Sequence, residues 1–202
     1  YTSIHPEKGV FTFNDIISIY DKNPHINEMM LTGGSPTMHP ALVNELTHFA
    51  NDRNILITIE TEGSAFVETA YPLGLLSISP KFSNSVPVEG TLTPAGKVVD
   101  ERMVKTHNRF RQNTSVIKQM IEFHSDYHFK PVWDGTKGNL KEIEDYRIEL
   151  GIPKDKTYIM PAGDTRESLI KMYPLVFDLC AEVGYNMTGR DHIIAFDTQR
   201  GV

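Results

Sequence analysis

Residues 30–40, MLTGGSPTMHP, contain the pattern that decides the fold: the end of an apolar run, two adjacent glycines, and a proline that begins a helix. Pro40 suits the first helical position, where a missing backbone N–H removes no hydrogen bond. The apolar residues that follow recur at helical spacing and predict one buried stripe. They are Leu42, Val43, Leu46, Phe49 and Ala50. The stretch therefore predicts a strand, a glycine turn and a helix.

Strand and helix patterns alternate on both sides of this stretch. A helix is expected over residues 14–20 and a strand over residues 28–32. Residues 55–60, ILITIE, are β-branched almost throughout, which fits a strand buried on both faces and favours a parallel sheet. Pro80 ends a strand over residues 75–79 because its ring offers no N–H to a neighbouring strand.

The second half of the chain continues the alternation after an irregular loop over residues 82–97. Asn139 and Gly151 are expected to begin and end one of the helices there. The remaining expected elements are helical residues 99–123, a strand over 127–132, a strand over 157–160, a helix over 165–183, and a last strand in either YNM or HIIAF. This order predicts an α/β fold with a mostly parallel sheet and outer helices.

Composition limits the classes of function. A chain of 202 residues with 40% hydrophobic residues can bury one sizeable core, so we expect a single domain over residues 1–202. The net charge of −6 argues against a nucleic-acid-binding surface and favours a small-molecule partner. No apolar run is long enough to span a membrane and no signal peptide is recognisable, so we expect a cytoplasmic protein without membrane contact. Cys180 is the only cysteine, which excludes an internal disulfide, and it is expected in the core.

Polar and glycine-rich residues follow four of the expected strands. The four strand ends are Thr32-Gly33-Gly34, Glu60-Thr61-Glu62-Gly63, Ser79-Pro80-Lys81 and Met160-Pro161-Ala162-Gly163. Each of them alone is an ordinary turn or strand terminator. Their recurrence at the carboxyl ends of parallel strands predicts a site at that edge of the sheet, where α/β proteins place their chemistry.

Five stretches resemble one known family over nearly the whole chain. They are LTGGSPTMHPAL, ITIETEGS, LLSISPKFSNS, YIMPAG and RDHIIAFDTQRGV, and the family is 7-carboxy-7-deazaguanine synthase, a group of radical S-adenosylmethionine enzymes. The resemblance implies a partial (β/α) barrel of the radical S-adenosylmethionine type. It also implies the ring contraction of 6-carboxy-5,6,7,8-tetrahydropterin to 7-carboxy-7-deazaguanine, with loss of ammonia, in queuosine and deazapurine biosynthesis.

The resemblance assigns roles to individual residues. Gly33 and Gly34 would let the backbone approach the methionine moiety, and Ser79 with Lys81 would hold the adenosine or ribose. The full set implied to bind the cofactor is Gly33, Gly34, Ser35, Glu60, Ser79, Pro80, Lys81, Met160, Pro161, Ala162 and Gly163. Thr32 and the terminal carboxylate of Val202 would contact the pterin substrate.

The family's cofactors and partners follow from the same resemblance. They are S-adenosyl-L-methionine, a [4Fe–4S] cluster and Mg²⁺, with an electron donor such as flavodoxin and a homodimeric assembly. The cluster requires cysteines at C-x3-C-x2-C spacing, and this chain has none there. We therefore expect the cluster ligands outside this sequence, with the cysteine loop and the first strand preceding residue 1. Ser35 stands where the family commonly has glutamate, so a hydroxyl replaces a carboxylate that would bind the methionine ammonium.

Two other functions remain open at this point. A noncatalytic module could keep the nucleoside site and bind S-adenosylmethionine or a pterin without turnover. A zinc-dependent hydrolase could use His124 and His128, four residues apart, with Asp126 between them, although no HExxH motif accompanies them.

Overall fold

The computed structural model describes residues 12–93 and 96–199, and every pairing between its named strands is parallel. One sheet has the order β1-β2-β3-β4, and a second has the order β5-β6-β7. Their bounds are β1 (Glu28–Leu31), β2 (Leu56–Thr61), β3 (Leu75–Ile78), β4 (Tyr127–Phe129), β5 (Val132–Trp133), β6 (Tyr158–Pro161) and β7 (Asn186–Met187). A parallel bridge between Phe129 and Thr157 joins the two sheets side by side. The predicted strand over residues 127–132 is thus interrupted, and β4 and β5 pair with different neighbours.

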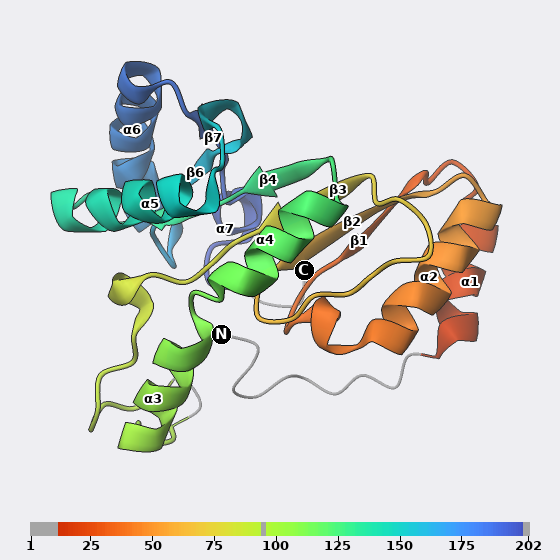
Figure 1. The fold of residues 1–202 in the computed structure, drawn as a ribbon, viewed down its shortest axis with the longest axis horizontal. Helices are drawn as coiled ribbons and strands as arrows, with labels where there is room; N and C mark the ends of the chain where they lie inside the picture. The colour runs from red at the N-terminus through yellow and green to blue at the C-terminus, as the bar shows by residue number, and fades with distance from the viewer. Residues whose placement is uncertain (1–11, 94–95, 200–202) are drawn as a thin grey trace.

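Helices connect these strands. Their bounds are α1 (Phe13–Lys22), α2 (Pro40–Asp52), α3 (Glu101–Phe110), α4 (Thr114–Phe123), α5 (Lys137–Leu150), α6 (Arg166–Val183) and α7 (Asp191–Phe196), with short 3-10 turns η1 (Pro36–Met38), η2 (Ser83–Ser85) and η3 (Lys154–Lys156). In Figure 1, α1 and α2 lie together at the β1 end of the structure, whereas α5 and α6 lie beyond β4. Helix α3 projects away from the sheets and has no buried residue.

Two local predictions were wrong in detail, and the structure decides a third that had left two candidates open. The helical region predicted over residues 99–123 is two helices, because Asn113 leaves helical geometry and caps α4 through its side chain. Asn139 does not cap α5: the helix begins earlier, and the Thr136 hydroxyl accepts the capping bond from the Asn139 N–H. Of the two candidates for the last strand, HIIAF forms α7 and YNM contains β7. Gly151 ends α5 in the left-handed conformation, as predicted.

Toward the carboxyl ends of its strands, the main sheet has one apolar face and one polar face. Ile78 pairs with Phe129 in register and both are fully buried, whereas one residue earlier Ser77 pairs with His128 and with Glu60 on the opposite face. The apolar face packs against the helices, with Ile117 of α4 and Tyr146 of α5 in the same core cluster. Because side chains alternate along a strand, residues two positions further on continue the polar face past the carboxyl ends of the strands.

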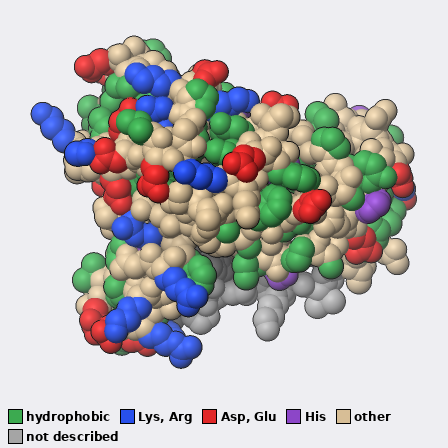
Figure 2. All heavy atoms as spheres, viewed as in Figure 1, with side chains coloured by type: hydrophobic (Ala, Val, Ile, Leu, Met, Phe, Trp, Pro, Cys, Tyr) green, Lys and Arg blue, Asp and Glu red, His purple; other side chains and the backbone are tan. Residues whose placement is uncertain are grey.

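Cys180 lies in the core on α6, as predicted. It is buried, and its thiol donates a hydrogen bond to the Asn186 carbonyl at 3.3 Å. On the face seen in Figure 2, acidic and basic side chains are mixed rather than separated, including over α3, where Lys105 pairs with Glu101. Among the residues that the structure describes, no helix combines the length and hydropathy needed to cross a bilayer.

Candidate functional site

The carboxyl ends of β1 to β4 meet at one edge of the sheet because the strands are parallel and in register. Backbone hydrogen bonds continue the pairing beyond the strands: the Ser79 N–H donates to the Thr61 carbonyl at 2.7 Å, and the Lys130 N–H donates to the Ile78 carbonyl at 2.7 Å. Three of the four predicted strand ends therefore lie next to one another. We call this edge, formed by residues 32–35, 60–64, 79–81 and 130, the strand-end rim.

Glu60 joins three strands at the rim. Its carboxylate accepts a hydrogen bond from Thr32 Oγ1 at 2.9 Å and forms an ion pair with Lys130 Nζ. Burial alone would raise the pKa of Glu60, but the bonds from Lys130 and Thr32 and the nearby charge of Lys81 hold it below its ordinary value. Glu60 is therefore a charged acceptor at neutral pH, in a position fixed by groups from β1 and β4.

The glycine turn after β1 is open on the side where side chains would stand. Gly33 and Gly34 have φ values of 78° and 58°, in the left-handed region that favours glycine. A Cβ built on Gly33 would meet no heavy atom of the described chain within 4 Å. The next residue, Ser35, donates a hydrogen bond to Glu62 Oε1 at 2.8 Å, which ties this turn to the end of β2.

The turn after β3 is held by the neighbouring strand. Ser79 Oγ donates to the Lys130 carbonyl at 2.9 Å, and Lys81 Nζ donates to the Ser79 carbonyl at 3.2 Å. Lys81 is exposed, but the protein atoms around its ammonium remove part of its hydration and so lower its pKa. The positive charges of Arg190 and Lys130 lower that pKa further. The negative charges of Glu62 and Glu60 raise it. Lys81 thus lies within electrostatic reach of charged groups from several strand ends.

The fourth predicted strand end follows β6 and connects to the rim through Arg190. Arg190 follows β7, and its guanidinium donates to the Gly163 carbonyl. Its charge also lowers the pKa of Lys81, so the ends of β6 and β7 are within electrostatic range of the end of β3. Burial lowers the pKa of Arg190 and Asp164 opposes that shift. Gly163 has no room for a side chain, since a Cβ there would lie 2.7 Å from Ser168 Oγ.

The predicted site residues differ in solvent exposure. Pro80 and Pro161 are buried, so their contribution to this edge is to end their strands. The other predicted residues of the described chain are at least partly accessible: Thr32, Gly33, Gly34, Ser35, Glu60, Ser79, Lys81, Met160, Ala162 and Gly163. Val202 lies outside the described residues.

Three charged residues of the rim region were absent from the predicted set: Glu62, Lys130 and Arg190. Glu62 belongs to one of the four predicted strand ends, but of its two carboxylates only Glu60 was in the predicted set. Lys130 follows β4 as the predicted residues follow their strands, and Pro131 after it repeats the Ser79-Pro80 pattern of a polar residue before a proline. That pattern was the available signal.

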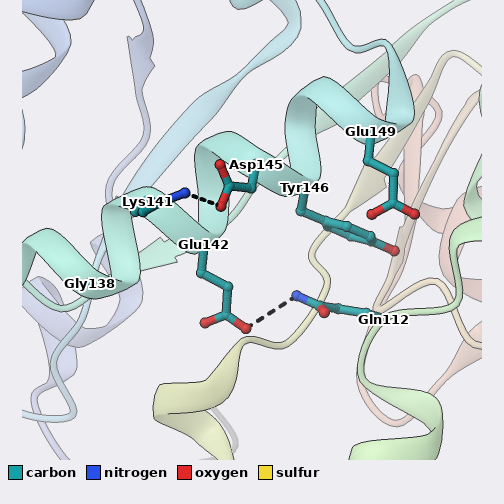
Figure 3. A pocket seen from close by; sticks show the side chains of 7 residues that line it. All are labelled: Gln112, Gly138, Lys141, Glu142, Asp145, Tyr146 and Glu149. Carbon is teal, nitrogen blue, oxygen red and sulfur yellow. Dashed lines mark hydrogen bonds and ion pairs between the residues drawn. The ribbon is translucent and has the colours of Figure 1, made fainter.

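A pocket of about 310 Å³ lies along α5 rather than at the glycine turn (Figure 3). Its lining includes Glu142, which accepts hydrogen bonds from the Ser83 N–H and hydroxyl, Arg111 and Gln112. Arg111 in turn accepts the Lys81 N–H through its carbonyl at 3.0 Å. Glu142 therefore fixes the segment that follows Lys81.

The two histidines considered for zinc binding have different surroundings. His124 caps the end of α4 and is buried, whereas the His128 ring stacks on Tyr158 with centroids 3.9 Å apart. Within residues 12–93 and 96–199, no group of three or more His, Cys, Asp or Glu side chains is arranged to hold a metal ion.

The chain does not supply the ligands of an iron–sulfur cluster. A [4Fe–4S] cluster is held by cysteine thiolates, and the one cysteine of the chain is buried on α6, where burial raises its pKa and favours the thiol. The open glycine turn and the charged groups of the rim do suit the amino-acid end of S-adenosylmethionine.

Comparison with known proteins identifies two relatives. The chain is 30% identical over 201 residues to the 7-carboxy-7-deazaguanine synthase of Rhodopirellula baltica, and the match covers 100% of the chain and 73% of the relative. It is 27% identical over 199 residues to the 7-carboxy-7-deazaguanine synthase of Halobacterium salinarum, covering 96% of the chain and 74% of the relative. A comparison with models of known protein families finds no match.

The fold has a counterpart among solved structures. The crystal structure of QueE from Escherichia coli superposes with a TM-score of 0.55 at 14% sequence identity, over 88% of this chain. The match spans 62% of the length of that QueE chain. This similarity confirms the predicted fold class, an α/β arrangement of parallel strands and outer helices as in QueE, and the identity to the Rhodopirellula baltica protein confirms the predicted family. The chain belongs to the 7-carboxy-7-deazaguanine synthase family.

Proposed function

We propose that the protein containing this chain contracts the ring of 6-carboxy-5,6,7,8-tetrahydropterin to give 7-carboxy-7-deazaguanine and ammonia, and that the strand-end rim binds S-adenosylmethionine and the pterin. The observation that supports this proposal most is the meeting of Gly33, Glu60, Ser79 and Lys81, from three separate strands, at one edge of the sheet. Queuosine and deazapurine biosynthesis in the cytoplasm is the context that family membership suggests.

The roles of the chain's residues follow from their chemistry. The backbone at Gly33 and Gly34 admits the methionine moiety, and Lys81 with Ser79 contacts the nucleoside. Glu60 accepts hydrogen bonds from the cofactor or the substrate, because its charge is maintained by Lys130 and its orientation by Thr32. Met160 and Ala162 extend the nucleoside site from the end of β6.

S-adenosylmethionine together with a reduced [4Fe–4S] cluster supplies the radical chemistry of such enzymes. We propose that the cluster ligands belong to a segment outside these 202 residues, since the chain has a single, buried cysteine. Mg²⁺, a flavodoxin-type electron donor and a homodimer remain part of the proposal through family membership alone.

The experiment that tests the function uses the protein as it is encoded, purified and reconstituted with iron and sulfide without oxygen. It is incubated with the pterin, S-adenosylmethionine and a reductant, and 7-carboxy-7-deazaguanine is measured by mass spectrometry. We expect product in the native protein and at least a tenfold loss of activity in Glu60→Gln, with Glu45→Gln, an exposed carboxylate on α2, as the matched control. Binding of S-adenosylmethionine without any product would instead support a noncatalytic binding module.

A further inference from the structure

The carboxylate of Glu62 is held at one oxygen and available at the other. Ser35 Oγ donates to Glu62 Oε1 at 2.8 Å, and Ser64 Oγ donates to the same oxygen. Within the described chain, Oε2 accepts no hydrogen bond. A half-buried carboxylate that is fixed by two hydroxyls is pre-organised for a cationic partner at its second oxygen.

The hydroxyl of Ser35 belongs to a short series of hydroxyl contacts between two turns. It lies 3.4 Å from Thr37 Oγ1, which lies 3.3 Å from Thr61 Oγ1, and Thr61 Oγ1 accepts the Gly63 N–H at 3.1 Å. Thr37 and Thr61 are both buried. The glycine turn after β1 and the turn that carries Glu62 are therefore fixed relative to each other.

Glu62 and Lys81 bring opposite charges to the same edge without neutralising each other directly. The charge of Glu62 raises the pKa of Lys81, so the two groups are within electrostatic range. No ion pair between them exists in the part of the chain that the structure describes. The negative charge of Glu62 thus remains available to a ligand that carries an ammonium, as the amino-acid end of S-adenosylmethionine does.

We propose that Glu62 binds the ammonium of the ligand's amino-acid end and that Ser35 is the positioning residue that orients its carboxylate. The inference rests on the proposed function, because it takes S-adenosylmethionine as the ligand of the rim. The residue after the two glycines, Ser35, carries no charge. The negative charge beside the glycine turn therefore comes from Glu62, at the end of β2. Ammonium recognition then depends on a carboxylate 27 residues along the chain from Ser35.

Two probes separate this inference from the proposed function. S-adenosylhomocysteine carries both the ammonium and the carboxylate, and its desamino analogue keeps only the carboxylate. Affinities are measured by calorimetry on the protein as it is encoded, with Glu62→Gln, Ser35→Ala and the control Glu45→Gln. Circular dichroism and the urea midpoint of each variant report whether it folds normally.

We expect Glu62→Gln to bind S-adenosylhomocysteine about tenfold more weakly or worse, since a charged hydrogen bond is lost, and to bind the desamino analogue as tightly as the unmodified protein does. Ser35→Ala should show the same selectivity with a smaller loss, and Glu45→Gln should show none. Unchanged binding of S-adenosylhomocysteine in Glu62→Gln, or an equal loss for both probes, overturns the role of Glu62. If the unmodified protein binds neither probe, the proposed function itself fails.

Discussion

Replacing Gly63 by alanine tests how tightly the end of β2 is packed against the helix layer. Gly63 has a φ of 86°, and a Cβ at this position would lie 2.7 Å from Ile117 Cγ1 and 2.8 Å from its Cδ1. Ile117 is fully buried on α4, so its side chain has little space into which it can move. The added methyl group therefore meets both backbone strain and a steric overlap.

The expected loss of stability is the sum of two terms. The left-handed conformation costs a non-glycine residue roughly 1–2 kcal/mol. Insertion of an extra methyl group into a packed core costs roughly 1–3 kcal/mol more. We expect the free energy of unfolding to fall by about 3 kcal/mol, which lowers the Tm of a domain of this size by roughly 6–12 °C.

Gly33→Ala is the matched control, because Gly33 has a similar φ of 78° but no described heavy atom within 4 Å of the added Cβ. It should carry only the backbone cost of roughly 1–2 kcal/mol. Urea denaturation followed by circular dichroism compares the two variants directly. Equal destabilisation by both would show that the packing at Gly63 contributes nothing, and the reasoning from the Ile117 contact would be wrong. We also expect Gly33→Ala to weaken the binding of S-adenosylhomocysteine, because the added methyl group occupies the open side of the turn. Gly63→Ala should not weaken that binding when it is measured under conditions where the variant is folded.

Three further predictions concern the charged and buried groups. Lys130→Met removes the main partner that lowers the pKa of Glu60, so carboxyl NMR should show that pKa rising, and an unchanged value would contradict the ion pair. Burial acts to raise the pKa of Glu142, but the bonds from Ser83 and Arg111 outweigh it and lower that pKa. Because the pKa of Glu142 is lower in the folded than in the unfolded protein, its ionisation stabilises the fold at a pH above the unfolded pKa of ~4.3. This stabilisation is lost as the pH falls through the folded pKa. The urea midpoint should accordingly fall less steeply below about pH 5 in Glu142→Gln than in the unmodified protein, and identical profiles would refute this. Burial raises the pKa of the Cys180 thiol, so a thiol reagent should react slowly with the folded protein and rapidly in urea; equal rates would contradict its place in the core.

Local patterns predicted most of the elements. The N1 proline of α2 and the left-handed Gly151 depend on contacts within a few residues, and the structure has both. Of the predicted buried stripe on α2, Val43, Leu46, Phe49 and Ala50 are buried, whereas Leu42 is exposed and that part of the prediction was wrong. The cap of α5 was predicted wrongly because Thr136 and Asn139 are both good capping residues, and the preference depends on where the chain leaves β5. The break between α3 and α4 was missed although Asn113 is of a residue type that is favoured at a helix N-cap and disfavoured in a helix interior.

The site was predicted only in part, because sequence spacing indicates which strand ends meet but not which side chains face one another. Parallel strands bring their carboxyl ends to one edge, so the strand ends at Thr32, Glu60 and Ser79 could be expected to meet once the sheet was inferred. Which charged side chains face one another there depends on strand order and register. Glu62 and Lys130 were missed although Glu62 lies in a predicted strand end and Lys130-Pro131 repeats the pattern of Ser79-Pro80, because a charged residue after a strand is ordinary until its partners in space are known.

The sequence by itself determined the alternation of strands and helices, the parallel sheet and the family, because each of these rests on short-range spacing or on motifs within single stretches. Only the tertiary structure decided the charge arrangement of the rim. Lys130 is 70 residues from Glu60, and Glu62 is 27 residues from Ser35. Such partners are chosen by the pairing of strands and the packing of helices behind them, and the electrostatic energy between two side chains depends on their distance in space rather than along the chain.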